Sequence, residues 1–234
     1  MSEITLSISI TTVLERHIYA SNLFNKLKEF DATLPINIIY DSARNGNWAN
    51  SKKAWNSYSR LATHHLVIQE DTWPSKNFYP NILNAIKVNP DNCISLYSGY
   101  EAKDRFDAAM TANVHWYKFK TGTTAQGLIL PTNMIIKMLK WTDKHIYKGL
   151  KCCDDQIINA WVLSQGKYIW QTVPELIDHL GEKISSIEKG LSLGTSYNLC
   201  DGSLINWNLG RTGKISDEQI FPYFQKWYKK WFVP

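Results

Sequence analysis

Short apolar segments alternate with longer amphipathic segments through the first seventy residues, and this alternation limits the folds that the chain can adopt. Residues 4–10 alternate apolar and small polar side chains, and residues 36–40 and 66–68 are further apolar runs of strand length. Between these runs, residues 17–30 and 51–61 have the character of helices. Strands that alternate with helices favour βαβ units, so we predict an α/β fold with a Rossmann-related open twisted sheet flanked by helices.

The rest of the chain continues this pattern less regularly. We predict further helices over 78–88, 132–141 and 154–164, and further strands over 93–97, 128–130 and 168–170. Thr132 is the expected N-cap of its helix. Residues 110–124 are aromatic and irregular, whereas in residues 216–232 Trp227 and Trp231 are spaced one helical turn apart. We therefore expect an irregular segment at the first position and an amphipathic helix at the second.

Length and composition indicate one large domain. The 234 residues include 44% hydrophobic and 20% charged residues, which is ordinary for a globular protein. We place the domain at 1–187 and expect 188–234 to be an extension packed on it. Because no apolar run approaches about 18 residues and the N-terminus lacks signal-peptide features, we expect a cytoplasmic monomer without stable membrane insertion. The four cysteines fit no zinc spacing and are expected to be free thiols.

Two adjacent carboxylates follow the third predicted strand, in the sequence Gln69-Glu70-Asp71-Thr72. In an open α/β sheet, ligands bind at the carboxyl ends of the strands, where this pair would lie. Neighbouring carboxylates repel each other unless a cation lies between them, and hard oxygen ligands suit Mg²⁺ or Mn²⁺ shared with a substrate phosphate. The motif therefore predicts a phosphorylated small molecule as substrate, the structural alternative being a solvated strand end.

Polar residues also follow the first two predicted strands. They are Thr11, Thr12, Glu15 and Arg16 after the first strand, and Asp41, Arg44, Trp48 and Lys53 after the second. Arg44 and Lys53 could contact phosphates, and Asp41 could accept a hydrogen bond from a ribose or a base. We expect the loops after all three strands to converge on one crevice. Solvated loops with helix caps are the alternative, above all for Glu15, Lys53 and Asn50.

Two later segments carry further candidates. Asp154 and Asp155 open the predicted helix 154–164, where a carboxylate either caps the helix or, beside a pocket, acts as a general base on an acceptor hydroxyl. His179 follows a predicted strand and precedes Gly181. It is either a third metal ligand or a histidine bonded to a backbone carbonyl.

These segments together resemble the GT-A glycosyltransferases, the fold of nucleotide-diphospho-sugar transferases. The family pattern of Thr-Thr-x-x-Glu-Arg after strand one is matched by residues 11–16, and the Asp that ends strand two is matched by Asp41. The usual Asp-x-Asp motif is replaced by Gln69-Glu70-Asp71, which leaves Asp71 as the safest metal ligand. The resemblance covers about residues 4–187 and extends into the later half.

In the later half, the acidic start of helix 154–164 and the segment from Pro174 to Ser186 resemble the acceptor-side half of small phage and bacterial transferases. The resemblance implies a UDP-sugar donor and a Mn²⁺ or Mg²⁺ ion held by Asp71, Glu70 and His179. It implies that Asp155 or Asp154 is the base. A base that faces away from the leaving group would invert the anomeric centre.

The sequence is most similar, within that family, to phage-encoded transferases that modify hydroxymethylated pyrimidines in DNA. The residues that carry this similarity are His64 to Asp71 and the loop Gly46-x-Trp48-x-Asn50. A net charge of +5 and the late lysines would suit a DNA acceptor, although a helix that packs on the domain explains those lysines as well. Two alternatives are a transferase that acts on lipopolysaccharide or another surface glycan, and a non-catalytic module that binds sugars or nucleic acid.

Overall fold

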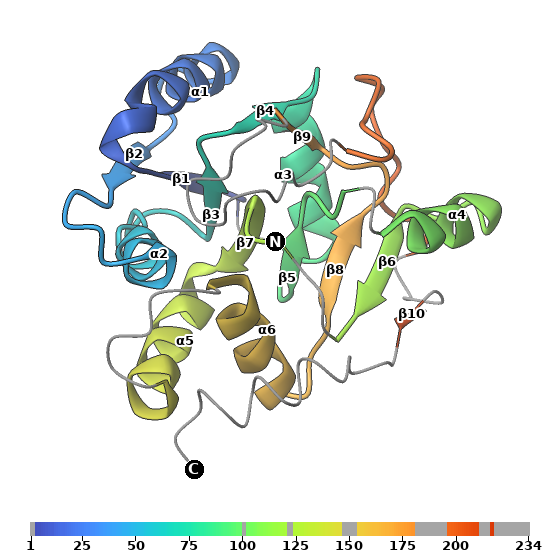
Figure 1. Ribbon diagram of the computed structural model, residues 1–234. Helices are drawn as coiled ribbons and strands as arrows, with labels where there is room; N and C mark the ends of the chain where they lie inside the picture. The colour runs from blue at the N-terminus through green and yellow to red at the C-terminus, as the bar shows by residue number, and fades with distance from the viewer. Residues whose placement is uncertain are drawn as a thin grey trace.

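The computed structural model describes residues 3–99, 102–120, 124–146, 154–180, 196–210 and 216–217. Its first half is the predicted βαβ arrangement (Figure 1). The elements are β1 (Leu6–Thr12), the 3₁₀ turn η1 (Leu14–Arg16), α1 (His17–Phe30), β2 (Ile36–Tyr40), α2 (Asn47–Asn56) and β3 (His64–Gln69). Strand β1 pairs in parallel with β2 on one side and with β3 on the other. The carboxyl ends of all three strands therefore lie at one edge of the sheet.

The second half extends this sheet with strands of both directions. The added strands are β5 (Cys93–Ser95), β6 (Trp116–Phe119), β7 (Gly127–Pro131), β8 (Ile169–Thr172) and β10 (Ser216–Asp217). Within the described residues the sheet has the order β10-β6-β8-β5-β7-β3-β1-β2. Strand β7 runs antiparallel to both β3 and β5, so it begins at the edge where β3 ends. The open, mixed α/β sheet confirms the predicted fold class.

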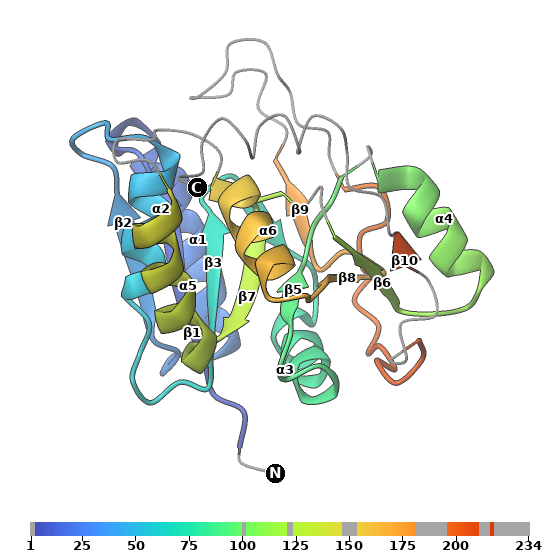
Figure 2. The same cartoon turned by 90° about the horizontal axis from the view of Figure 1, so that it is seen from below.

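Helices cover both faces of the sheet, and each face has its own apolar core. Helices α1 and α3 (Phe78–Val88) pack on one face together with Ile8, Ile68 and Ile129. Helices α2, α5 (Thr132–His145) and α6 (Asp154–Ser164) pack on the other face, with Val67 and Leu128. Alternate residues of β3 and β7 thus face opposite cores, as the two-residue period of a strand requires. Figure 2 shows α6 lying alongside β7 and β3.

A two-stranded ribbon lies beside the main sheet. Strand β4 (Thr72–Pro74) pairs antiparallel with β9 (Ile177–His179), and Thr72 lies opposite His179. The sequence Trp73-Pro74-Ser75 is typical of a turn, but Trp73 and Pro74 belong to this strand. The pairing matters for the site, because it brings His179 to the segment that follows β3.

Other differences from the prediction have local causes. The segment 110–124 was expected to be irregular, but it contains the end of α4 (Lys103–Thr111) and strand β6. Strand β6 is fixed by pairing with β8 and by the buried Trp116, whose indole N–H donates to the carbonyl of Trp207 at 2.7 Å. Such long-range contacts cannot be read from local periodicity.

Two helix starts also differ from the prediction. Helix α2 begins at Asn47, four residues before the expected start. Thr132 is the first residue of α5 and does not cap it, because its hydroxyl donates to the carbonyls of Ala62 and Thr63. Residues 216–217 form β10 and not the start of a helix. The rest of the predicted 216–232 helix and the boundary between 187 and 188 lie outside the described residues. No helix in the described part of the chain is long and apolar enough to cross a membrane.

Candidate active site

The loops after β1, β2 and β3 converge at the carboxyl edge of the sheet, as predicted. The backbone N–H of Glu70 donates to the carbonyl of Thr11 at 3.2 Å, and that of Asp41 donates to the carbonyl of Thr12 at 2.9 Å. An ion pair between Arg44 and Glu15 joins the first loop to the second. Backbone and side-chain contacts therefore hold the three loops together around one site.

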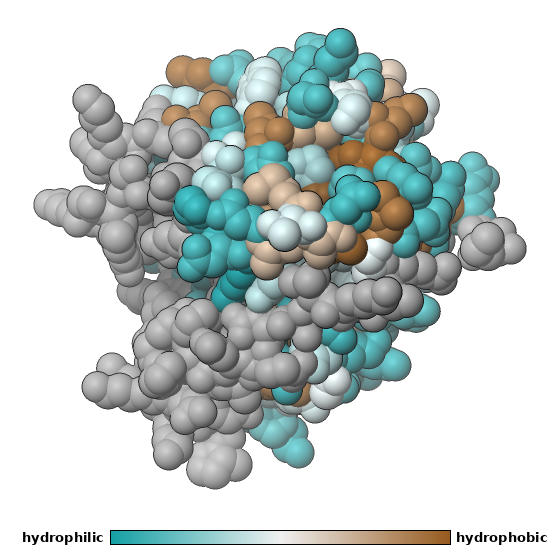
Figure 3. Space-filling view, turned by 90° about the vertical axis from the view of Figure 1, so that its right-hand side faces the viewer, coloured by the Kyte–Doolittle hydropathy of each residue, from teal (hydrophilic) through white to brown (hydrophobic). Residues whose placement is uncertain are grey.

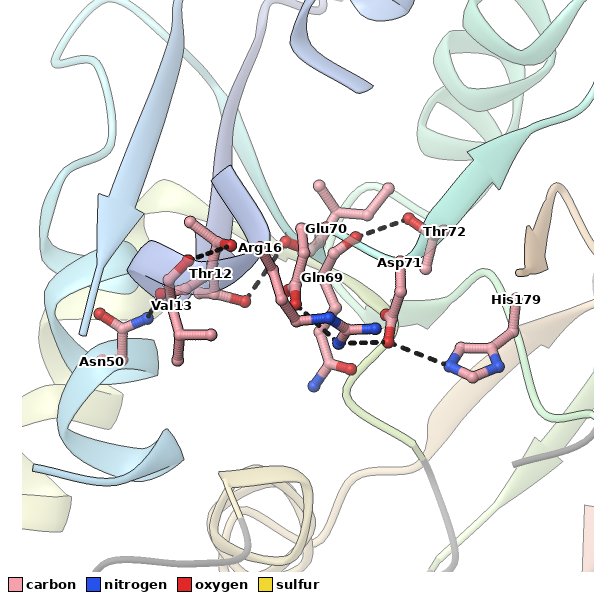
Figure 4. A network of polar contacts seen from close by, with 11 residues as sticks. Thr12, Val13, Arg16, Asn50, Gln69, Glu70, Asp71, Thr72 and His179 are labelled. Atoms are coloured by element: carbon pink, nitrogen blue, oxygen red, sulfur yellow. Dashed lines mark hydrogen bonds and ion pairs between the residues drawn. The ribbon is translucent and has the colours of Figure 1, made fainter. Parts of the chain in front are cut away.

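Arg16 bridges the two carboxylates of the acidic motif (Figure 4). Its Nη1 lies 2.8 Å from Oε1 of Glu70 and 2.9 Å from Oδ2 of Asp71. All three side chains are largely buried, with 13%, 8% and 12% of their side-chain surface exposed. The sequence predicted a cation between the two carboxylates. In the structure that cation is the guanidinium of Arg16, one of the residues that were expected to line the crevice.

The two carboxylates have different proton affinities. Burial, together with the charge of Asp71, raises the pKa of Glu70 to about 7. For Asp71, burial acts in the same direction, but the hydrogen bond and charge of His179 and the charge of Arg16 outweigh it and lower the pKa. Asp71 is therefore the carboxylate of the pair that stays ionised at neutral pH.

His179 lies beside Asp71, with Nε2 3.4 Å from Oδ2. The pairing of β4 with β9 produces this contact, and the backbone N–H of Leu180 adds a 2.8 Å hydrogen bond to the carbonyl of Asp71. The ring of His179 also lies 6.0 Å from that of Tyr97. The structure thus brings together the three residues that the sequence proposed as metal ligands, although Glu70 is directed to Arg16.

The donor set fits a divalent cation in part. Oδ1 of Asp71 is buried and has no hydrogen-bond partner in the structure, while Oδ2 of the same carboxylate lies 3.4 Å from Nε2 of His179. Among the described residues, however, no three His, Cys, Asp or Glu side chains are grouped closely enough to enclose a metal. Asp71 and His179 could therefore supply two ligands, and the remainder would have to come from a bound substrate or water.

The residues proposed on the second loop occupy several environments. Asp41 is buried, and its carboxylate accepts hydrogen bonds from the backbone N–H groups of Asn45 (2.8 Å) and Gly46 (2.9 Å), so it shapes its own loop. Trp48 is buried in the core, whereas Lys53 is exposed on α2. Gly46 has φ of 93°, a left-handed conformation that favours glycine and that ends the loop before α2.

The start of α6 reaches the same edge of the sheet. Oδ1 of Asp154 accepts a 3.1 Å hydrogen bond from Nδ2 of Asn47, which opens α2 at that edge. Burial raises the pKa of both Asp154 and Asp155, and the charge of Asp154 adds to the effect on Asp155. Asp154 is buried, while Asp155 is partly exposed. Either carboxylate can therefore accept a proton near neutral pH, and Asp155 is the more accessible of the two.

A small hollow adjoins these carboxylates. It is lined by Ser51, Trp55, Val67, Ala125, Leu128, Asp154, Asp155 and Ile158. Asn47 and the segment that leads into β7 were not predicted to belong to the site. Neither carries a motif, and only the pairing of β7 with β3 brings residues 125–128 to the site.

Glu175 is a further buried residue for which the sequence predicts no role. Its carboxylate is fully buried and accepts four backbone hydrogen bonds, from Ser98 (2.8 Å), Gly99 (2.7 Å), Tyr197 (2.7 Å) and Asn198 (3.1 Å). It therefore joins two loops that are about a hundred residues apart. A buried carboxylate that accepts four backbone hydrogen bonds stabilises the loops that it joins, and no local sequence pattern predicts this role.

Similar proteins are found by comparison of three-dimensional structures and not by comparison of sequences. No protein-family model matches the chain, and a search of curated proteins finds no match. Among solved structures, S. aureus TarS is 12% identical over 72% of this chain with a TM-score of 0.48, and the chain spans only 58% of that structure's length. Drosophila β1,4-galactosyltransferase 7, crystallised with manganese, UDP-Gal and xylobiose, is 9% identical over 97% of this chain and 80% of that one, with a TM-score of 0.46.

A third similar structure is the galactosyltransferase LgtC in complex with donor and acceptor sugar analogues. It is 11% identical over 66% of this chain and 70% of that chain, with a TM-score of 0.41. At this level the alignments give no argument about activity. The proposed function therefore rests on the sheet order and on the contacts of this chain's own residues.

Proposed function

We propose that the protein is a GT-A-type glycosyltransferase that moves a hexose or pentose from a UDP-sugar to an acceptor hydroxyl. The observation that carries this proposal is the cluster of Arg16, Glu70, Asp71 and His179 at the carboxyl edge of a parallel βαβ unit, beside the acidic start of α6. That edge is where α/β proteins bind nucleotides and phosphates. The cluster would hold a diphosphate, and the acidic helix start would face the acceptor.

Cationic groups at the acidic motif favour the departure of a nucleoside diphosphate. Asp71 and His179 would hold Mn²⁺ or Mg²⁺, which when bound neutralises charge on the leaving diphosphate. Arg16 lies within the same cluster and adds a fixed positive charge. Arg44 is mostly exposed at the rim, so its guanidinium can reach a phosphate from solvent.

The acidic residues at the start of α6 supply the base. In the proposed reaction the carboxylate of Asp155, or of Asp154, takes the proton from the acceptor hydroxyl. The hydroxyl oxygen forms the bond to the anomeric carbon, and the bond from that carbon to the diphosphate oxygen breaks with its electron pair leaving on UDP. Direct displacement of this kind inverts the anomeric centre.

For the acceptor, we propose a 5-hydroxymethylpyrimidine in DNA, on the basis of sequence resemblance and the net charge of +5. In one of several contacts between basic and aromatic residues, Lys118 and Lys120 lie 4.6 and 5.5 Å from the ring centroid of Tyr168. This cluster lies at the end of β6 and the start of β8, at the sheet edge opposite Asp71. On the face with α4, hydrophilic and apolar residues are mixed (Figure 3). Because the basic cluster lies at the sheet edge opposite Asp71, it does not support DNA binding at the site itself. Such a contact has to be tested directly.

A glycan acceptor is the alternative, and one observation favours it. Trp73 is 39% exposed only two residues after Asp71, and Leu180, which is 44% exposed, is hydrogen-bonded through its backbone to Asp71. An exposed indole close in sequence to Asp71 offers a surface on which a sugar ring can stack, on the face of the β4–β9 ribbon opposite to His179. The same surface would also accept a flipped base, so the acceptor assay has to include both classes.

The decisive experiment measures UDP release from a panel of UDP-sugars with Mn²⁺, with and without hydroxymethylated duplex DNA. Mass spectrometry of the digested nucleosides then identifies any transferred sugar. A nucleoside heavier by a hexose or a pentose supports both donor and acceptor. UDP release without a modified nucleoside supports the transferase and points to a glycan acceptor. If no UDP-sugar binds and no UDP is released, the results favour the alternative that the protein is a non-catalytic binding module.

A further inference from the structure

Helices α2 and α5 lie side by side on one face of the sheet, and their outer surface is strongly basic (Figure 1). The ion pair between Lys52 and Asp143 links the two helices, and Asp143 is the one acidic residue on either of them. The exposed basic side chains of α2, of α5 and of the loop between α2 and β3 are Lys53, Arg60, Lys137, Lys140 and Lys144. We call these five residues the α2–α5 basic surface.

Three of these lysines project from one side of α5. Lys137, Lys140 and Lys144 are spaced by three and four residues, which places them on neighbouring turns of the same helix face. Like charges at this spacing repel each other and destabilise a helix. The helix dipole compensates for Lys144, which lies in the last turn, but it does not compensate for Lys137. The stability of the helix therefore does not explain the cluster.

The cations of this surface differ from most other basic residues because they lack partners. Within the described part of the chain, none of the five makes an ion pair, a side-chain hydrogen bond or a contact with an aromatic ring. The basic side chains described elsewhere have a carboxylate, carbonyl or aromatic partner, except Lys76 and Lys87; an example is the 2.7 Å ion pair of Lys26 with Glu29. Five unpaired positive charges on one surface are available to an external anionic partner.

Two exposed aliphatic side chains lie within the same surface. Leu61 is 89% exposed next to Arg60, and Ile136 is 46% exposed next to Lys137. The loop with Leu61 contacts the start of α5 through a 2.9 Å hydrogen bond from the hydroxyl of Thr132 to a backbone carbonyl of that loop. A duplex nucleic acid gains little from aliphatic side chains next to its phosphates, whereas a bilayer buries them among its headgroups and acyl chains. The combination of cations and aliphatic side chains therefore favours a lipid partner.

We propose that the α2–α5 basic surface docks on an anionic lipid bilayer, with Leu61 and Ile136 entering the headgroup region. The partner follows from charge complementarity, because each unpaired cation near a negatively charged leaflet contributes to binding. The contact is peripheral and reversible, since the apolar sides of both helices stay packed on the sheet. This inference goes beyond the proposed transferase function and does not depend on it.

Sedimentation with vesicles tests the electrostatic part of the proposal. At about 0.1 M salt, the full chain should bind vesicles of phosphatidylcholine that contain about one-third phosphatidylglycerol, and it should not bind phosphatidylcholine alone. A variant that combines Lys137→Gln, Lys140→Gln and Lys144→Gln should bind the anionic vesicles roughly a hundredfold more weakly, because each lysine near the surface contributes about fivefold.

The matched control removes the same charge from the other side of the sheet. It combines Lys26→Gln on α1, Lys87→Gln on α3 and Lys76→Gln just before α3, and it should bind within about twofold of the unaltered protein. Thermal unfolding checks that both triple variants are folded. Equal losses in the two would show that net charge and not this surface drives binding, and would overturn the proposal. Absence of binding to anionic vesicles by the unaltered protein would overturn it as well.

A second variant separates a lipid partner from a nucleic acid. Leu61→Asn should weaken binding to anionic vesicles about fivefold and leave any binding to duplex DNA unchanged. Leu204→Asn, at a leucine that is 68% exposed in the loop that contacts α3, is the control and should change neither. If Leu61→Asn binds vesicles like the unaltered protein while the α5 triple variant loses binding to DNA, the surface is a nucleic-acid contact and the lipid proposal fails. These assays contain no nucleotide sugar, so their failure leaves the transferase proposal in place.

Discussion

Nη1 of Arg16 lies 2.9 Å from Oδ2 of Asp71 and is at the same time 2.8 Å from Glu70. One fixed positive charge therefore neutralises half of the acidic motif before any ligand arrives. A divalent cation on Asp71 would lie close to this charge, and the repulsion weakens its binding. A diphosphate brings negative charge and offsets that repulsion, so metal and donor should bind better together than separately.

The first prediction concerns this charge. Arg16→Gln should tighten the binding of Mn²⁺ alone by roughly tenfold, which corresponds to about 1.4 kcal/mol, because the guanidinium charge no longer repels a cation bound to Asp71. Electron paramagnetic resonance of free Mn²⁺ measures this affinity without any reaction. Arg44→Gln, which removes a mostly exposed charge paired with Glu15, is the control and should leave it unchanged. Weaker Mn²⁺ binding in Arg16→Gln would contradict the electrostatic argument and would indicate that Arg16 instead positions Asp71.

A second prediction concerns Asp71 itself. Asp71→Asn should reduce turnover by at least about a hundredfold, because the variant loses the ionised carboxylate that we propose as a metal ligand. Its melting temperature should stay within a few degrees of wild type, since the asparagine can still accept from Arg16. Asp143→Asn, which breaks only a surface pair with Lys52, serves as the control. Full activity in Asp71→Asn would remove the acidic motif from the mechanism.

The fold class and the position of the acidic motif could be predicted from the sequence, because both depend on local patterns. β1, α1 and β2 follow from periodicity, and a strand that ends in carboxylates places them at the ligand edge wherever the sheet is parallel. The same reasoning located Asp154 and Asp155 at a helix start. These features need no knowledge of distant contacts.

The partner of the acidic pair could not be predicted in the same way. That Arg16 fills the space between Glu70 and Asp71 depends on how two loops more than fifty residues apart approach each other. Ala125 and Leu128 line the hollow beside Asp154 only because β7 runs antiparallel beside β3, and neither residue gives a sequence signal. Strand β6 was missed for a related reason, since its pairing with β8 and its contact with Trp207 are non-local.

The third prediction addresses the base. Because burial raises the pKa of Asp155, activity under saturating donor should increase with pH along a limb that lies well above 3.8, the ordinary value for an aspartate. Asp155→Asn should lower kcat by about 10²–10⁴-fold while leaving the Kd of UDP nearly unchanged. Asp154→Asn tests the other candidate, and the larger loss identifies the base. An unchanged pH profile in both variants would exclude this pair as the base.

The fourth prediction uses His65 as an internal probe of folding. The ring is fully buried, accepts at Nδ1 from Ser7 (2.8 Å) and donates from Nε2 to the carbonyl of Ala54 (3.1 Å), so the neutral form suits both partners. Burial lowers the pKa of His65 to about 4 from its usual 6.5. The unfolded chain therefore takes up this proton first as the pH falls. The contribution of His65 to the free energy of unfolding is fully present above pH 6.5. It should decrease by about 3 kcal/mol as the pH falls from 6.5 to 4.

Urea unfolding at a series of pH values measures this loss. His65→Gln should be less stable at pH 7, because it disturbs a packed site beside Trp55, but its stability should fall less steeply between pH 6.5 and 4. His17→Gln, at an exposed histidine on α1, should show the wild-type slope. If His65→Gln and wild type lose stability in parallel over this range, then other groups cause the acid sensitivity and the buried imidazole of His65 already accommodates a proton in the folded protein.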